Sequence, residues 1–349
     1  MSSRRYLLLQ QLNILDLNTD VLDSIFDLVS VQDACRFRLC SQRAAQAAAR
    51  RAMSSKTISI VTQRWLDFMM KRREKIALIQ KLTLVFPTPH QTVTSDLSTD
   101  FVEFLRAASG VKEFVLNTPA ETFGQIPRYP QIITRFSLLQ ALELPNSGSE
   151  TSSWILSEPH GFSSRLTRLY LGVLNFPDSD VPPVRPLSTL RSLSVKFLSG
   201  NLGCLVQFAP HIVQLQLIAD YDTTRQLVRC ISGTSVVPTA PSHFWQSLLR
   251  VSGSLYDVYR ILPLFQRVDR LVLMHHRLQA TEQHVITETL QRKQPCCLEL
   301  QDYSDHFPFA CYRSLPHIAM RLFYLRIRLP CEAKQCLVLY EFVSFRHIH

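Results

Sequence analysis

The side chains that could do chemistry are few, and they form no recognisable catalytic pattern. His275 and His276 directly follow an apolar run, while Asp302, Asp305 and His306 gather in a short polar stretch. The histidines favour exposed positions at a strand end, and the second group fits a turn better than a calcium or zinc site. The sequence has no nucleophile elbow, phosphate-binding glycine loop or His-Glu-x-x-His helix. We therefore expect no catalytic residue, no metal site, no cofactor and no enzymatic activity.

The cysteines point to a reducing compartment rather than to a reactive site. There are nine, scattered among apolar neighbours without a Cys-x-x-Cys pair, although Cys296 and Cys297 are adjacent. This usage is typical of reduced thiols, so we predict a cytoplasmic or nuclear protein. For Cys35 and Cys40 it favours packing inside a helical segment over reactivity.

Length, composition and charge limit the class of protein. The chain has 349 residues, of which 46% are hydrophobic and 19% charged, which allows a sizeable core. No apolar run is long enough to cross a membrane, and none resembles a signal peptide, so we expect no membrane partner. The net charge of +10 is consistent with solvated basic helix faces or with an acidic partner. Nucleic acid is the least supported partner, because no RNA- or DNA-binding pattern is present.

The stretch from Leu17 to Ser41 has the spacing of short amphipathic helices. An apolar stripe recurs at helical intervals after Thr19 and Asp20, which are good N-cap types. Asp33 can cap a second helix running through Phe37 and the alanine-rich segment 44–49. So small a unit cannot bury both stripes alone, so it needs either a partner chain or a larger domain behind it.

The order of residue types in this stretch resembles an F-box, the helical module that docks on the adaptor subunit of a cullin ubiquitin ligase. Most positions from Leu17 to Arg43 match in type and spacing, but Asn18 replaces the usual proline and Ala44 the usual tryptophan. The resemblance implies an F-box core and an adaptor-binding face supplied by Leu17, Asp20, Val21, Leu22, Ile25, Phe26, Val29 and Leu39. The alternative is a helical hairpin that caps a larger domain.

After residue 78 a short phrase recurs: an apolar residue, two variable ones, an apolar one, a variable one and an apolar one. Its copies begin at Ile79, Val111, Leu139, Leu166, Leu190, Ile212 and Val268, with weaker ones ending at Leu300 and Ile327. Most copies are about 20–29 residues apart, which is the period of leucine-rich repeats. The long gap before Val268 leaves room for a degenerate copy near Trp245 to Val251.

Each phrase alternates as a strand with one buried face, and helical patterns lie between several phrases. The predicted fold class is therefore α/β: a short all-helical F-box module followed by a leucine-rich-repeat solenoid with parallel strands on its inner wall. A generic α/β domain with leucine-rich strands is the alternative. The predicted divisions are an extension (1–13), the F-box-like module (14–57), a linker helix (58–78), the solenoid (79–330) and a cap or tail (331–349).

The variable residue between the last two apolar positions of each phrase should point out of the inner wall. This row is Thr83, Val115, Glu143, Tyr170, Ser194, Gln216, Val272, Glu299 and Arg326. Because tyrosine and arginine dominate interface energetics, we predict target contacts from this row and its neighbours. The predicted contacts are Lys81, Arg168, Tyr170, Arg270 and Arg326.

These observations predict a substrate-recognition subunit of a cullin-type ubiquitin ligase. Its partners would be the adaptor, through it a cullin, and an unknown target protein that is acidic or phosphorylated. The competing hypothesis is a leucine-rich scaffold without ligase assembly, which Asn18 and Ala44 favour. A basic nucleic-acid-associated protein is a third class, supported by charge alone.

Overall fold

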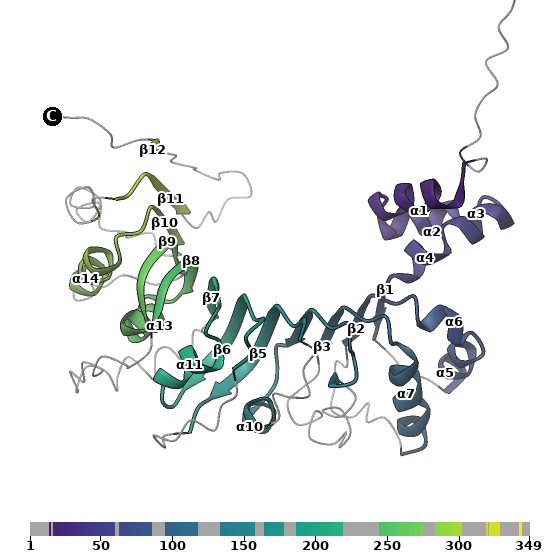
Figure 1. Ribbon diagram of the computed structural model, residues 1–349, viewed down its shortest axis with the longest axis horizontal. Coiled ribbons are helices and arrows are strands. Elements are labelled where there is room, and N and C mark those ends of the chain that lie inside the picture. The colour runs from purple at the N-terminus through teal and green to yellow at the C-terminus, as the bar shows by residue number, and fades with distance from the viewer. Residues whose placement is uncertain are drawn as a thin grey trace, which may run out of the picture. The chain divides into compact units, whose positions relative to one another are not determined.

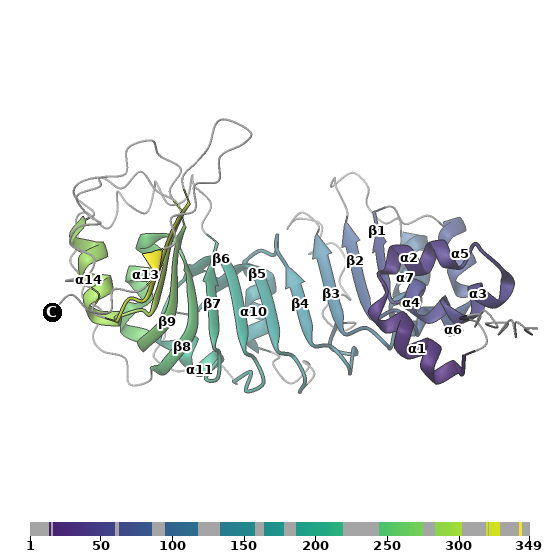
Figure 2. The same ribbon diagram turned by 90° about the horizontal axis from the view of Figure 1, so that it is seen from above.

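The computed structural model describes residues 14, 17–59, 63–85, 95–117, 133–157, 164–177, 186–218, 244–274, 283–301, 319, 321–328 and 342–343. The chain divides into two compact units, Met1–Val85 with Thr92–Val115, and Phe86–Gln91 with Leu116–His349. Figures 1 and 2 show the elements of both units.

The first unit opens with four short helices and continues as a mixture of strands and helices. Its elements are α1 (Thr19–Leu28), α2 (Val31–Phe37), α3 (Gln42–Ala47), α4 (Ala49–Met53), β1 (Ser55–Ile58), α5 (Gln63–Met70), α6 (Arg73–Ile76), β2 (Lys81–Val85), α7 (Ser95–Ala107) and the start of β3 (Glu113–Asn117). β1 and β2 pair in parallel. In the same unit α5 packs against α7, where Trp65 lies edge-on to buried Phe104 with ring centroids 5.0 Å apart.

The alanine-rich segment differs from the single long helix expected from sequence. α2 ends at Phe37, and α3 starts afresh after Ser41, whose hydroxyl accepts a hydrogen bond from the Ala44 N–H at 3.1 Å. Serine stabilises a helix start in this way because it satisfies an otherwise unpaired backbone donor. The intervening turn leaves Leu39 87% exposed. The strand β1 was not expected either, and it falls in the last residues assigned to the helical module.

The second unit alternates strands with helices. Its elements are β4 (Ala141–Leu144), α10 (Ser149–Ser157), β5 (Arg168–Asn175), β6 (Ser192–Ser199), α11 (Gly203–Phe208), β7 (Gln214–Leu217), β8 (Trp245–Gly253), α13 (Leu255–Ile261), the 3-10 helix η3 (Leu262–Leu264), β9 (Phe265–Met274), α14 (Gln283–Lys293), β10 (Cys297–Gln301), β11 (Tyr324–Arg328) and β12 (Phe342–Val343). Every strand from β2 to β11 falls on a predicted phrase, and β8 falls on the degenerate copy.

The strands of the second unit lie side by side in the order in which they occur in the chain. β4 to β11 are parallel, and β12 adds to β11 in the antiparallel direction. α10, α11, α13 and α14 lie on one face of these strands (Figure 1). The predicted α/β class, with a helical module followed by a parallel sheet, agrees with this arrangement.

Most of the strands share a hydrogen-bond pattern with the strand before them. The Gln140 carbonyl accepts from the N–H groups of both Thr167 (2.8 Å) and Arg168 (3.0 Å). The Thr167, Arg191, Val213 and Cys296 carbonyls each accept two successive N–H groups of the next strand in the same way, as do Ser54 and Gln80 in the first unit. In these pairs one carbonyl therefore helps to fix the register of the strand that follows.

The leucines of the phrases form the core. Leu169, Leu171, Leu193 and Leu215 are 0–2% exposed, because alternate strand residues turn to the same face of the sheet. Burying each such side chain contributes about 1.5–3 kcal/mol. The residues between them stay half-buried or exposed, so the opposite face carries the side chains that can meet a partner.

A close backbone approach explains one glycine of this core. The Gly172 N–H donates to the Ser147 hydroxyl at 2.9 Å, between β5 and the turn that leads into α10. A Cβ atom at position 172 would lie 2.5 Å from the Ser147 carbonyl oxygen, which is shorter than any ordinary contact. Only glycine fits here without moving the backbone.

Candidate functional site

The helical module near the N-terminus is built on a small core. α1 starts at Asn18, whose side chain accepts from the Asp20 N–H at 3.1 Å, and it buries Leu22 and Phe26. Those two pack with Ala34, Ala48 and Ala52, while the Phe37 ring tilts against Phe26 with centroids 5.2 Å apart. Alanine at the contacts lets these short helices approach closely.

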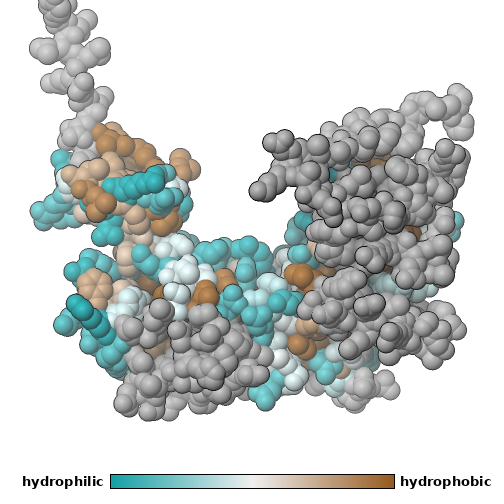
Figure 3. Space-filling view, turned by 180° about the vertical axis from the view of Figure 1, so that it is seen from behind, coloured by the Kyte–Doolittle hydropathy of each residue, from teal (hydrophilic) through white to brown (hydrophobic). Residues whose placement is uncertain are grey.

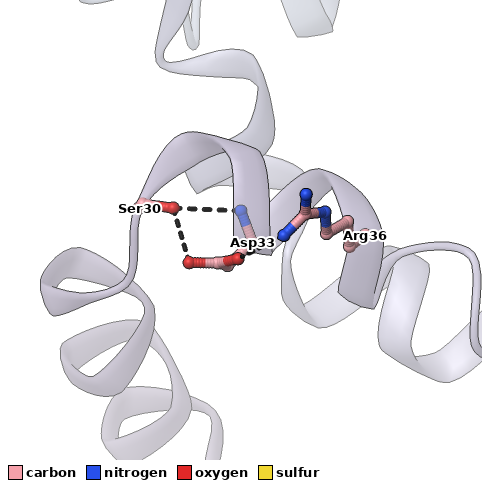
Figure 4. Close-up of polar contacts among 3 residues, drawn as sticks. All are labelled: Ser30, Asp33 and Arg36. Carbon is pink, nitrogen blue, oxygen red and sulfur yellow. Dashed lines mark hydrogen bonds and ion pairs between the residues drawn. The ribbon is translucent and has the colours of Figure 1, made fainter.

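The connection between α1 and α2 is fixed by polar contacts. The Ser30 hydroxyl accepts from the Asp33 N–H at 3.1 Å and donates to the Asp33 carboxylate at 2.7 Å (Figure 4). Arg36 reaches the other carboxylate oxygen at 3.3 Å. From α4, Arg51 Nε donates to the Val29 carbonyl at 2.7 Å. This turn is therefore held by an N-cap and by a side chain from a later helix.

Large apolar side chains remain on the surface of this module. Val21 is 46% exposed, Leu28 90% and Leu39 87%, and Ile14 is also exposed. Val21, Ile25 and Leu28 follow one another at intervals of four and three residues, so they share one face of α1. Figure 3 shows hydrophobic residues at the surface of the module. Exposed leucines concentrated in so small a module indicate a protein-interaction surface.

The structure sorts the predicted adaptor-binding residues into two groups. Leu22 and Phe26 are core residues and cannot form an exposed face, whereas Asp20, Val21 and Leu39 are exposed. Half-buried positions are held by Leu17, Ile25 and Val29. Leu28 was not among the predicted adaptor-binding residues, although its helical spacing from Val21 and Ile25 places it on the same face of α1.

The two positions that depart from the F-box pattern have local explanations. Asn18 caps α1 with its side chain, a contact that proline cannot make. Ala44 has no exposed surface, so a tryptophan there would require the neighbouring helices to move. Both residues therefore suit the packing of this module.

The cysteines of the module and the nearby Lys56 differ in their exposure to solvent. Cys35 and Cys40 are exposed, so the expectation that they pack in the core was wrong. Cys35 lies on the exposed side of α2 next to buried Ala34, and Cys40 lies in the turn between α2 and α3. Lys56 is half-buried, donates to the Ala52 carbonyl at 3.2 Å, and burial lowers the pKa of its ammonium group.

Residues 14–52 match the family model of the F-box domain. The helical module is an F-box domain. No curated protein matches the chain. F-box domains bind the adaptor subunits of cullin ubiquitin ligases, so the match supports an adaptor-binding role for these residues. F-box proteins are generally non-catalytic. The exposed Val21, Leu28 and Leu39 belong to this F-box domain.

The predicted target contacts lie in different places. Lys81 on β2 is exposed and pairs with Glu113 at 3.1 Å, and it belongs to the first unit. Arg168 and Tyr170 share β5, where burial, followed by the Glu143 carboxylate, raises the pKa of the Tyr170 phenol. Arg270 on β9 and Arg326 on β11 flank β10. The structure thus brings only some of these residues together.

Two members of the predicted outward row are buried. Val272 has no exposed surface, and Glu299 is 2% exposed. The Glu299 carboxylate forms an ion pair with Arg270 of the neighbouring strand, which compensates its charge. By register both residues still share a face with the rest of the row, but they are buried there, so the expectation that the whole row is open to a partner is wrong for these two residues. Sequence reasoning also missed Arg250 on β8, the register partner of Arg270.

The described residues contain no group of three side chains suited to hold a metal ion. None of the helices in the described ranges is both long and apolar enough to span a bilayer. His275, His276, Asp302, Asp305 and His306 lie outside the described residues.

Proposed function

We propose that this protein is the substrate-recognition subunit of a cullin-type ubiquitin ligase. The F-box domain would bind the adaptor, and the strand-rich unit would bind the target protein. The observation that carries the proposal is an F-box match whose structure leaves Val21, Leu28 and Leu39 exposed. Such a subunit needs no ubiquitin-transfer chemistry, because holding the target near the ubiquitin-loaded enzyme raises its local concentration.

The proposal includes the assignment of residues 79–330 to irregular leucine-rich repeats. Parallel strands in sequence order, starts that share one hydrogen-bond pattern, and helices on one face support it. Deleting residues 168–191 tests it, since Arg168 and Ser192 are register partners and the deletion keeps the phase. A repeat protein stays cooperatively folded without one repeat, whereas a generic α/β domain unfolds.

For adaptor binding we propose the exposed face of α1 with Leu39, supported from inside by Leu22 and Phe26. For the target we propose Lys81, Arg168, Tyr170, Arg270 and Arg326. We also propose a cytoplasmic or nuclear location, in keeping with the free cysteines of the described residues.

Adaptor binding tests the function directly. The full chain is mixed with the adaptor, and the dissociation constant is measured by isothermal titration calorimetry. We expect a stable complex that the paired change Leu28→Ser and Leu39→Ser weakens by about a hundredfold, because each exposed leucine acts as an interface anchor. The matched control is Leu249→Ser, a 52% exposed leucine of β8 outside the F-box domain.

A second candidate function is a scaffold protein that has lost adaptor binding. Asn18 and Ala44, which replace the usual proline and tryptophan, favour it. A folded wild-type chain that forms no complex with the adaptor would establish this alternative and refute the ligase role.

A further inference from the structure

Three arginines and a single carboxylate lie on one face of the sheet in the second unit. Arg250, Arg270 and Cys297 are successive register partners on β8, β9 and β10. Glu299, two residues after Cys297, is the register partner of Arg326 on β11. Alternate strand residues share a face, so the three guanidinium groups and the Glu299 carboxylate lie on the same side.

The charges of this cluster do not cancel. Glu299 is already paired with Arg270, and its side chain is only 3% exposed, while that of Arg270 is 42% exposed. Gln214 and Gln216 on β7, and Ser252 and Tyr324 on β8 and β11, are the neutral neighbours in the same rows. One carboxylate therefore faces three guanidinium groups, and the described part of these rows supplies no second acid.

The guanidinium groups also have unused donors. The Nε atoms of Arg250, Arg270 and Arg326 are buried and have no hydrogen-bond partner among the described residues. A buried donor without a partner costs about 1–3 kcal/mol. Guanidinium can only donate, so the missing partners must be acceptors. The same feature on three arginines of one cluster points to a group that brings oxygen atoms.

The pKa of the Cys297 thiol is influenced by two of the arginines and by Glu299, which shows that these groups lie near it. Burial raises the pKa of the Cys297 thiol, while Arg270 and Arg250 act on it in the opposite direction and Glu299 reinforces the rise. Both arginines and the carboxylate therefore lie within electrostatic reach of one thiol. Arg250 and Arg270 lie on adjacent strands, about 4.8 Å apart, and Arg326 lies on the second strand beyond Arg270. Arginine side chains are long enough to converge over this distance on the oxygens of one anion.

We propose that Arg250, Arg270 and Arg326 form an oxyanion-binding site that receives a carboxylate or phosphate group of the target peptide. The proposal deepens the suggested target-binding role and rests on it. It replaces a diffuse set of contacts with one cluster on β8 to β11, to which Arg250 belongs and Lys81 does not. The ion pair with Glu299 holds Arg270 in place.

The arginine Nε–Hε signals of the isotope-labelled full chain test the proposal by nuclear magnetic resonance. The probes are the N-acetyl amides of phosphoserine, glutamate and serine, titrated at constant ionic strength. Single lysine substitutions at Arg250, Arg270, Arg326 and Arg267 assign the signals by their loss. Arg267, an exposed arginine on the same strand as Arg270, is the control. We expect the three signals of the cluster to shift with at least one anionic probe, while Arg267 and the serine probe show no change.

The outcomes separate the possible ligands. Shifts with phosphoserine alone assign a phosphate, and shifts with both anions assign any carboxylate or phosphate. Each lysine variant of the cluster should weaken probe binding about tenfold although its charge is kept, because lysine lacks the planar fork. No shift, or equal shifts at Arg267, would overturn the site. Adaptor binding of the same variants should stay unchanged, so failure of this site is distinguishable from failure of the ligase role.

Discussion

The F-box domain and the strand-rich unit place opposite kinds of side chain on their surfaces. The small core of the F-box domain consists of alanines with Leu22 and Phe26, whereas the bulky Leu28 and Leu39 are exposed. The second unit buries its leucines and turns arginines such as Arg250 and Arg270 toward the partly exposed face. An apolar surface suits one constant partner, whereas a charged surface selects a ligand by its own charge.

The largest expected effect separates core from surface within the F-box domain. Phe26→Ala should destabilise the domain by about 3–5 kcal/mol, because it opens a cavity in a small core. Leu28→Ala should change stability by less than about 0.5 kcal/mol and weaken adaptor binding instead. Urea unfolding and adaptor titration of both variants measure the two effects. Equal destabilisation by both changes would show that Leu28 is not a surface residue and would break the comparison.

The second effect concerns a charge inside the second unit. Lys293 of α14 is buried, its ammonium lies 4.7 Å from the Phe265 ring centre and donates to the Phe265 carbonyl, and burial lowers its pKa to about 8. The charge of the neighbouring Arg292 contributes to this lowering. The unfolded chain therefore binds more protons than the folded one between pH 8 and the ordinary lysine pKa of 10.5.

It follows that this lysine opposes folding below pH 8 and that the opposition fades as the pH rises to 10.5. The stability of the wild type relative to Lys293→Met should rise over this window by at most about 3 kcal/mol. Urea unfolding of both proteins at a series of pH values measures the difference, which also removes the contribution of other groups. A difference that falls with pH would mean that the folded protein stabilises the charged form.

A third change tests the tight backbone contact in the second unit. Gly172→Ala should destabilise this unit by about 1–3 kcal/mol, because the added methyl group overlaps the Ser147 carbonyl. Ser194→Ala on the neighbouring strand is the control, since it removes a half-buried hydroxyl without adding a methyl group to a close backbone contact. Thermal unfolding compares the two. If alanine at 172 left the melting temperature unchanged, the close approach of β5 to the Ser147 turn would be refuted.

The smallest effect returns to the F-box domain. Ser30→Ala should cost about 1 kcal/mol, because it removes the N-cap of α2. Ser30→Asp keeps an acceptor at this position and should retain most of the stability. Loss of stability in both variants would show that the hydroxyl donor to Asp33, not the cap, holds the turn.

The comparison of regions also shows what sequence could predict. The phrases predicted the strands because each strand buries alternate apolar residues. These residues follow at a fixed distance from the N–H groups that bond to one carbonyl of the preceding strand. The F-box pattern was recognisable because helical spacing and capping side chains are local properties. Ser41 also lies in that pattern, but its role as a cap that divides the alanine-rich segment was missed, because helix propensity alone favours continuation.

The candidate sites were less predictable, because exposure and pairing depend on neighbours that the sequence does not reveal. Leu28 and Phe26 are both apolar residues of α1, yet one is exposed and the other is core. Glu299 was expected to face outward like Glu143, but Arg270 pairs with it across strands. Arg250 was overlooked because β8 carries the most degenerate phrase, and only its register with Arg270 reveals its place.

The pairing of strands in chain order has a consequence for synthesis. A strand of the second unit that leaves the ribosome meets a partner that has already emerged, since β5 to β11 each add to the strand before them. Nascent chains fold from the N-terminal side, and closing such short loops is fast. The helices of the F-box domain emerge earlier still, so an adaptor that binds them has its site before the arginines of β8 to β11 are translated.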